Sequence, residues 1–345
     1  MIEIQAPSDG GNPQDPAAIR RLGDGHIRVS PFSEDGDANY KFALHVEARN
    51  TDPAAAPLTL EVDWGDQVYT PSRRFVHVGR EGAWQFLPAQ VDGSMTLVQC
   101  DVPPGRTAIG LSPAYGLADY RGFEADLVGT AFRRESLGRN EQGREIAAFH
   151  LGGGPQRILI TARVHPYETA ASFCVEGAMR WLAGGDAAAE ELLRAAHVVV
   201  VPMPNPDGVY AGLCKRTAVG GVDLTRESVG SGDGAAQALL RLVEDWRPTV
   251  YLDLYGWMHW DEDGWYALQD GVGDGFQRAA AEYPALAANR WKGALERPSA
   301  TAIRSHCLDR FGTRTLEVSY RWPGRTVDQM REIGAATMQA VPALF

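Results

Sequence analysis

The sequence predicts an antiparallel β-sandwich at residues 1–125, followed by an α/β domain at residues 126–345 with a mixed, mostly parallel sheet flanked by helices. Three observations lead to this fold class. The chain has 345 residues, which is long for a single hydrophobic core. The first part shows short alternating runs and no helical period. The second part shows unbroken apolar runs that alternate with helical periods, which is typical of a sheet covered on both faces.

The N-terminal part contains several short strand patterns. Residues 40–49 (YKFALHVEAR) alternate apolar and polar side chains, which is the period of a half-buried strand. Similar runs lie at 58–64, 73–78, 95–102 and 107–111, separated by turn clusters such as TDPAAAP, VDGS and PPG. Several short strands at this spacing favour an antiparallel sandwich.

The C-terminal part alternates strands and helices. Apolar strands are predicted at 157–163, 197–203, 250–254 and 313–319, and NEQG at 140–143 predicts a hairpin. Helices are predicted at 170–182, at 236–243 and after Thr326, which stands three residues before Gln329 as in a capping box. In such sheets the functional site lies at the carboxyl ends of the strands.

Composition and charge exclude several classes of partner. The formal net charge is -11, which argues against a general binder of nucleic acid or anionic membrane. The chain has no apolar run of 18 residues, and its first residues do not have the pattern of a secretory signal. The four cysteines form no CxxC pair and are expected to be reduced thiols. We therefore expect a cytoplasmic protein with neither a nucleic-acid nor a membrane partner.

Polar residues that suit chemistry follow the predicted strands. His165 and Glu168 come after the first apolar strand, and imidazole and carboxylate are ordinary zinc ligands, although the same pair also suits a plain loop at a helix N-terminus. Glu317 stands in an apolar strand, where a carboxylate is costly unless it is paired or functional. Arg216 and Arg226 suit a carboxylate or an oxyanion, or are surface charges.

Five segments, in order, resemble the zinc carboxypeptidase family, and most of all its cytosolic carboxypeptidase branch. They are ARVHPYETAASF, VPMPNPDGV, GVDLTR, YLDLYG and TRTLEVSY, and the likeness covers residues 130–345 approximately. The strand-rich N-terminal region also fits, because this branch carries a small β-sandwich before its catalytic domain. The resemblance implies a carboxypeptidase-like fold and a zinc-dependent hydrolase of a C-terminal peptide or amide bond.

The resemblance also implies residue roles. His165 and Glu168 would be the first two ligands of one zinc ion, and Asp223 would orient His165. Glu317 would take a proton from the metal-bound water, and Arg216 would stabilise the oxyanion.

Arg226 would hold the terminal carboxylate of the substrate.

Two positions depart from the family pattern. Thr225 replaces an asparagine before that arginine, and Tyr255 stands where the third ligand, a histidine, is expected. Three alternatives follow: Tyr255 ligates as a phenolate, His259 takes its place, or zinc binds weakly or not at all.

These departures leave three functions open. The first is removal of a C-terminal amino acid from a peptide. The second is a metal-dependent amidase that acts on a small molecule, suggested by Thr225 and the aromatic residues Trp257 and Trp260. The third is a catalytically impaired relative that binds peptides. The expected partner is a peptide or small amide with a carboxylate. Arg304 and Arg314 are candidates for a basic subsite, although the sequence favours them as surface charges.

Overall fold

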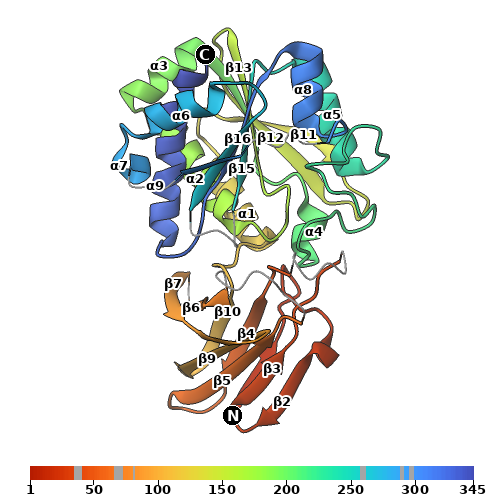
Figure 1. Cartoon of the computed structure of the whole chain (residues 1–345), viewed down its shortest axis with the longest axis vertical. Helices are drawn as coiled ribbons and strands as arrows, with labels where there is room; N and C mark the ends of the chain where they lie inside the picture. Colours follow the sequence, from red (N-terminus) through yellow and green to blue (C-terminus); the bar gives the residue numbers. More distant parts are fainter. Residues whose placement is uncertain (35–40, 66–72, 81, 257–261, 288–290, 295–298) are drawn as a thin grey trace.

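The structure, a computed structural model, describes all residues except 35–40, 66–72, 81, 257–261, 288–290 and 295–298. Figure 1 shows an all-β half that contains the N-terminus and an α/β half that contains the C-terminus. No helix in the described ranges is long and apolar enough to cross a membrane.

Two five-stranded sheets make up the N-terminal half. The first has the order β1 (Ile2–Gln5), β4 (His45–Asn50), β10 (Gly105–Gly110), β6 (Phe75–Arg80), β7 (Ala83–Pro88). The second has the order β2 (Ile19–Gly23), β3 (His26–Val29), β5 (Ala56–Asp63), β9 (Met95–Val102), β8 (Gln90–Asp92), and a 3-10 turn, η1 (Pro16–Ala18), precedes β2. Neighbouring strands are antiparallel except β3 and β5, which are parallel. The second sheet therefore departs from the purely antiparallel expectation.

Alternating side chains of these strands build the N-terminal core. In β5, Leu58, Leu60 and Val62 are buried while their neighbours are more exposed. In β4, Val46 and Ala48 are buried in the same way. The period of two thus places one face of each strand inside, as the sequence predicts.

An eight-stranded mixed sheet forms the C-terminal half. Its order is β11 (Arg133–Arg139), β12 (Glu145–Gly152), β14 (Ala196–Val201), β13 (Gln156–Ala162), β15 (Val250–Tyr255), β18 (Arg314–Ser319), β16 (Asp263–Ala267), β17 (Trp291–Ala294). The four central strands β14, β13, β15 and β18 are parallel. β11 and β12 add antiparallel pairs at one side, and β16 is antiparallel to β18 at the other.

Helices pack on both faces of this sheet. The helical elements of this half are α1 (Leu117–Asp126), α2 (Thr169–Ala183), α3 (Ala187–Ala195), α4 (Pro206–Tyr210), α5 (Gly234–Trp246), α6 (Val272–Ala280), α7 (Pro284–Ala287), α8 (Ile303–Phe311), α9 (Val327–Ala340) and the 3-10 turn η4 (Val341–Leu344). Figure 1 shows α2 and α9 on one side of the sheet and α5 and α8 on the other. Separate apolar clusters lie under the two layers, so the strands are buried on both faces.

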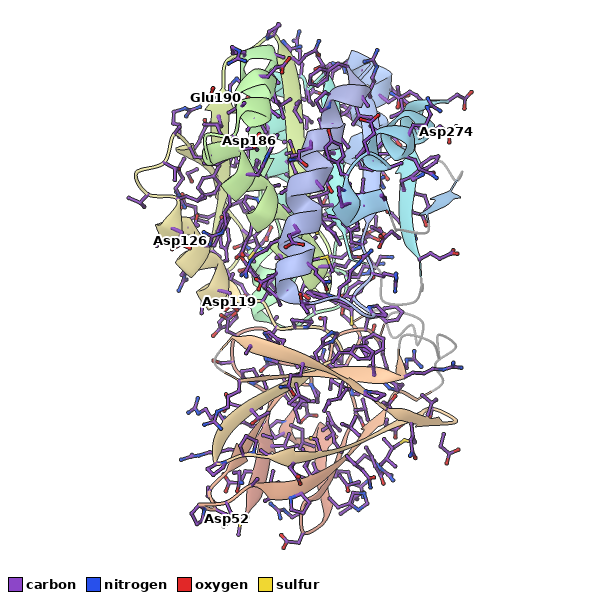
Figure 2. All side chains as sticks on the ribbon, turned by 90° about the vertical axis from the view of Figure 1, so that its left-hand side faces the viewer. Asp52, Asp119, Asp126, Asp186, Glu190 and Asp274 are labelled. Carbon is purple, nitrogen blue, oxygen red and sulfur yellow. The ribbon has the colours of Figure 1, made fainter. Side chains whose placement is uncertain are left out.

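The two halves meet near α1. The carboxylate of Asp9 accepts hydrogen bonds from the backbone N–H groups of Leu117 and Ala118, both at 2.9 Å. Figure 2 shows Asp119, in the first turn of α1, at the level where the halves meet. The domain boundary expected at residue 125 falls inside α1, and the division into two domains stays a prediction.

Candidate active site

Three parallel strands bring the predicted residues together. β13 ends at Ala162, and the loop after it carries His165 and Glu168, the latter at the N-terminus of α2. In the register of the sheet, Asp253 of β15 lies beside Glu317 of β18. Because side chains alternate along a strand, Asp253 and Tyr255 project from the same face. The carboxyl ends of the strands thus gather the side chains that the sequence singles out.

His165 lies between two carboxylates. Its Nδ1 is 3.0 Å from Oε1 of Glu168, and its Nε2 is 3.2 Å from Oδ1 of Asp223. All three residues are buried. Burial alone lowers the pKa of His165, but the charge of Glu168 and hydrogen bonds to both carboxylates outweigh it and raise the pKa to about 10. The remaining oxygen of Glu168 accepts a hydrogen bond of 2.8 Å from the backbone N–H of Gly256.

Asp223 also has a buried cationic partner that the sequence did not indicate. Nζ of Lys215 lies 3.1 Å from Oδ2 of Asp223, and Lys215 is only 5% exposed. Burial raises the pKa of Asp223, but His165 and Lys215 together hold it well below its usual range. Lys215 therefore brings a buried positive charge to the carboxylate that contacts His165.

Tyr255 is buried and hydrogen-bonded at its hydroxyl. It donates to Oδ2 of Asp253 at 2.7 Å and lies 2.8 Å from Oγ1 of Thr225. Oγ1 of Thr225 is in turn 2.9 Å from Nε2 of His165. Burial, together with the charge of Asp253, raises the pKa of the Tyr255 hydroxyl well above its usual value, so the phenol is neutral. His259, the alternative third ligand, lies outside the described residues, as do Trp257 and Trp260.

Arg304 is part of the site, and its interpretation as a surface charge is wrong. It is 5% exposed, its Nη2 forms an ion pair with Oε2 of Glu317, and its Nε lies 3.7 Å from Oδ2 of Asp253. Helix α8 carries this side chain to the ends of β15 and β18. Arg314 instead donates to the backbone oxygen of Leu344, at 2.7 Å.

Burial and the neighbouring charges of the site shift the pKa of Glu317. Burial raises its pKa to about 6, the charge of Arg304 opposes this, and the charges of Glu168 and His165 also act on it. Glu317 is 9% exposed, so its carboxylate is nearly enclosed. A carboxylate that titrates near neutral pH suits a proton acceptor.

The two predicted arginines lie nearer the surface. Nη1 of Arg216 donates to the backbone oxygen of Gly221 at 2.7 Å and to Oε2 of Glu227 at 2.9 Å. The side chain of Arg226 is 58% exposed, and its Nε is 3.9 Å from Oδ2 of Asp223. Arg226 is therefore accessible to a ligand, whereas Arg216 already has partners in its own loop.

The donors present fit two positions of a tetrahedral metal site but not the third. Two ligands of one zinc ion, each about 2.0–2.1 Å from the metal, lie about 3.3 Å apart, so Nδ1 of His165 and Oε1 of Glu168 are suitably placed. The neutral hydroxyl of Tyr255 is engaged elsewhere. Within the ranges that the structure covers, no group of three His, Cys, Asp or Glu side chains is placed to hold a metal ion.

Comparison with known proteins identifies relatives for part of this chain. Residues 127–228 match the sequence model of the zinc carboxypeptidase family, Peptidase_M14. Cytosolic carboxypeptidase 6 of Mus musculus is 31% identical over 139 residues, which are 36% of this chain and 25% of that protein. Cytosolic carboxypeptidase 1 of Xenopus laevis is 43% identical over 70 residues, which are 20% of this chain and 6% of that protein. The match thus spans a quarter or less of these curated relatives.

Solved structures share the fold over nearly the whole chain. A metallo-carboxypeptidase from Burkholderia cenocepacia superposes with a TM-score of 0.85 and 18% identity, covering 99% of this chain and 98% of that one. A metallo-carboxypeptidase from Pseudomonas aeruginosa, solved in complex with (2-guanidinoethylmercapto)succinic acid, gives a TM-score of 0.83 and 16% identity, with coverage of 99% and 98%. The carboxypeptidase-like fold expected from the sequence is confirmed.

Proposed function

We propose that the protein is a hydrolase that cleaves the amide bond next to a terminal carboxylate, because residues 127–228 match the sequence model of the zinc carboxypeptidase family. The observation that carries the proposal is the convergence of Glu317 with His165 and Glu168. These residues come from segments about 150 positions apart, yet the charges of His165 and Glu168 both act on the pKa of Glu317.

Glu317 is the proposed proton acceptor for the attacking water. Its pKa of about 6 leaves it ionised at neutral pH yet basic enough to take a proton in the transition state. Arg304 holds the carboxylate from one side, which fixes its orientation. The proton would then pass from Glu317 to the leaving amine, so that one group serves first as base and then as acid.

Cationic side chains define the proposed substrate. Arg226 is exposed enough to meet a substrate carboxylate, and a guanidinium binds a carboxylate through two parallel hydrogen bonds. Arg216 would stabilise the developing oxyanion after exchanging its contact with Glu227 for the substrate. The Pseudomonas aeruginosa neighbour was solved with a derivative of succinic acid, which is a dicarboxylate. We therefore propose peptides and small amides that end in a free carboxylate as the substrate class.

Zinc is the metal of the family, and the described side chains do not complete its three-donor site. His165 and Glu168 supply two donors. The hydroxyl of Tyr255 is bound to Asp253 and Thr225. We infer that zinc, if these residues alone bind it, is held more weakly than by three donors. The proposed ligand role of Tyr255 has less support from this geometry than those of His165 and Glu168.

Thr225 and Tyr255, which depart from the family pattern, keep two other functions open: binding of a peptide without cleavage, and an amidase activity on small molecules. A site in which Tyr255 is a neutral phenol and Glu317 is paired with Arg304 is suited to binding a terminal carboxylate without cleaving it. The amidase alternative rests on Thr225, which stands where the family pattern has an asparagine before Arg226. Both alternatives involve the same group of residues, so one substrate panel separates them from the peptidase function.

The deciding experiment presents the purified full-length chain with three matched substrate sets, with and without added zinc. These are N-acyl dipeptides with a free carboxylate, the same dipeptides as C-terminal amides, and N-acylated small molecules. Cleavage of the first set only, detected by mass spectrometry, is the expected result. Glu317→Gln should lower kcat by about 100-fold or more, and the exposed Glu332→Gln is its control.

Other outcomes of this panel overturn the peptidase proposal. Preferential cleavage of the small-molecule amides would identify an amidase. Binding of the free-carboxylate peptides by calorimetry, with no cleavage at any zinc concentration, would identify a peptide-binding relative. Full activity of Glu317→Gln would remove Glu317 from the mechanism.

A further inference from the structure

A residue of the β-sandwich half reaches the segment that supplies cations to the site. The carboxylate of Glu34 accepts hydrogen bonds from three successive backbone N–H groups: Cys214 at 2.9 Å, Lys215, and Arg216 at 2.7 Å. Successive N–H groups that point to one side form a binding site for an anion, and here the anion is a side chain from 180 residues earlier in the chain.

The residues just before this segment, Tyr210 and Gly212, also bind the N-terminal half. The backbone N–H of Gly10 donates to the oxygen of Tyr210 at 3.0 Å, and Nδ2 of Asn12 donates to the oxygen of Gly212 at 2.8 Å. A Cβ atom at Gly212 would lie 2.0 Å from the backbone oxygen of Gly11, so only glycine permits this approach. Glu34 therefore acts on a segment that is already held close to the N-terminal half.

From this segment a chain of contacts leads to His165. The backbone of Lys215 is held by Glu34, and its Nζ lies 3.1 Å from Oδ2 of Asp223. The other oxygen of Asp223 lies 3.2 Å from Nε2 of His165. Arg216, whose N–H also binds Glu34, is the proposed oxyanion partner. The positions of the Arg216 side chain and the His165 ring thus depend on the backbone amides of residues 214–216.

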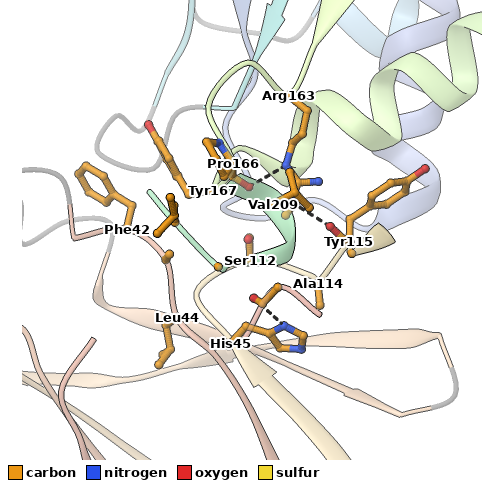
Figure 3. A pocket seen from close by; sticks show the side chains of 16 residues that line it. Phe42, Leu44, His45, Ser112, Ala114, Tyr115, Arg163, Pro166, Tyr167 and Val209 are labelled. Carbon is orange, nitrogen blue, oxygen red and sulfur yellow. Dashed lines mark hydrogen bonds between the residues drawn. The ribbon is translucent and has the colours of Figure 1, made fainter. Parts of the chain in front are cut away.

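An aromatic contact reaches the same histidine from the N-terminal half. Phe42 stacks on Tyr167 with ring centroids 5.4 Å apart. Tyr167 stacks on the His165 ring at 6.4 Å with an interplanar angle of 12°. Figure 3 shows Phe42 and Tyr167 next to each other in the lining of the small cavity between the two halves, close to Pro166. This contact is independent of the hydrogen bonds of Glu34.

We propose that Glu34 is a positioning residue for the active site: by anchoring the backbone of residues 214–216, it sets the placement of Arg216 and, through Lys215 and Asp223, of His165. The inference rests on the proposed function for its kinetic consequence only. The structural part of the inference is that the N-terminal half helps to position the site. It is supported by the hydrogen bonds of Glu34.

Charge and burial explain why one carboxylate has this effect. Hydrogen bonds from N–H groups to an ionised acceptor are stronger than neutral ones. Cys214 and Lys215 are buried, and without Glu34 their backbone N–H groups lose a charged acceptor, which costs free energy unless the segment moves. We expect the segment to move, and a displacement of about 1 Å at a reacting group can lower the rate by 100-fold.

Asp9 provides a matched control. Like Glu34, it is a carboxylate of the N-terminal half that caps backbone N–H groups of the other half, here those of Leu117 and Ala118. Unlike Glu34, it makes no hydrogen bond to the segment at 214–216. Asp9→Ala should therefore loosen the contact between the halves without moving His165.

The experiment compares Glu34→Ala, Glu34→Gln and Asp9→Ala in the full chain by amide hydrogen exchange and by imidazole ¹⁵N NMR. The His165 signals are assigned by their loss in His165→Gln. In Glu34→Ala we expect amide exchange at residues 214–216 to be at least about tenfold faster, with shifted His165 signals. In Asp9→Ala both should be unchanged at those positions. Glu34→Gln, which keeps one acceptor oxygen, should lie between.

Kinetics extend the test if the chain cleaves the peptide panel. Glu34→Ala should then lower kcat/KM by about 10- to 100-fold, mainly through kcat, because both groups that it positions act at the reacting bond. If no variant, including the wild type, cleaves any substrate, the proposed function fails while exchange and NMR still decide the role of Glu34. Three results would overturn the inference. In Glu34→Ala, amide exchange at 214–216 could be unchanged, or it could be faster while the His165 signals stay the same. Alternatively, Asp9→Ala could have the same effects as Glu34→Ala. If Glu34→Ala does not fold, Glu34→Gln carries the same comparison.

Discussion

Thr225 and Tyr255, the two residues that depart from the family pattern, are hydrogen-bonded to each other, with Oγ1 and the phenol oxygen 2.8 Å apart. Thr225 also contacts Nε2 of His165, and Tyr255 also binds Asp253. A phenol is longer than an imidazole, and the short threonine accommodates its hydroxyl. We infer that the two departures are coupled, because a hydrogen bond joins their side chains.

Restoring a histidine at position 255 should restore a third metal donor. Tyr255→His removes the phenol from the network and places an imidazole near His165 and Glu168, so we expect zinc affinity to rise by about 100-fold or more. Adding Thr225→Asn should raise it further, because the asparagine fills the space that the phenol leaves. Competition with a chromophoric chelator measures both affinities. Tyr251→His, four residues earlier on the same strand, is the matched control. Equal zinc affinity in wild type and Tyr255→His would place position 255 away from the metal.

Removing only the Tyr255 hydroxyl tests its ligand role directly. Tyr255→Phe keeps the ring but removes one hydrogen-bond partner from the side-chain oxygens of Asp253 and Thr225. We expect the free energy of unfolding to fall by about 1–3 kcal/mol, while zinc affinity stays the same. Urea denaturation and chelator competition measure the two quantities. A large loss of zinc affinity in Tyr255→Phe would show that the phenol is a ligand after all.

Close packing of α2 on α9 should be sensitive to a single methyl group. A Cβ at Gly334 would lie 1.8 Å from the backbone oxygen of Cys174 in α2, the helix that begins beside Glu168. Because backbone cannot give way as a flexible side chain can, Gly334→Ala should destabilise the protein by about 2 kcal/mol or more. Gly122→Ala, in an exposed turn of α1 with no atom within 4 Å, should instead be neutral or stabilise by about 0.5–1 kcal/mol. Equal thermal stability of the two variants would contradict this packing.

Elements with strong local signals were predictable from the sequence. The capping box at Thr326 and Gln329 is present at the start of α9, and the apolar run at 197–203 overlaps most of β14 (Ala196–Val201). Strands without such a signal were missed. β2 reads IRRLG and β7 reads AWQFLP, and both are largely exposed edge strands, so neither needs the apolar alternation that identifies a buried strand.

The site was predictable only where a motif carried it. His165 and Glu168 follow the parallel strand β13, and Glu317 lies near the end of the parallel strand β18. The topology of the sheet brings these strand ends to one edge. Arg304, Lys215 and Glu34 reach the site through tertiary packing, from a helix, a loop and the other half of the chain. No local pattern distinguishes a buried arginine of this kind from a surface charge, because its partners lie far away in sequence.

The ion pair of Arg304 with Glu317 predicts the pH dependence of activity. Glu317 can accept a proton only when ionised, so kcat/KM should rise with pH through about 6, the pKa to which burial raises this carboxyl. The charge of Arg304 lowers that pKa, so Arg304→Gln should move the midpoint above 6 and Arg304→Lys should move it less. Removing the guanidinium from the buried carboxylates of Asp253 and Glu317 should also lower the free energy of unfolding by about 3–5 kcal/mol. Circular dichroism at every pH therefore checks that each variant is folded. A midpoint that stays in place or falls in Arg304→Gln would mean that Glu317 is not the group whose ionisation limits the reaction.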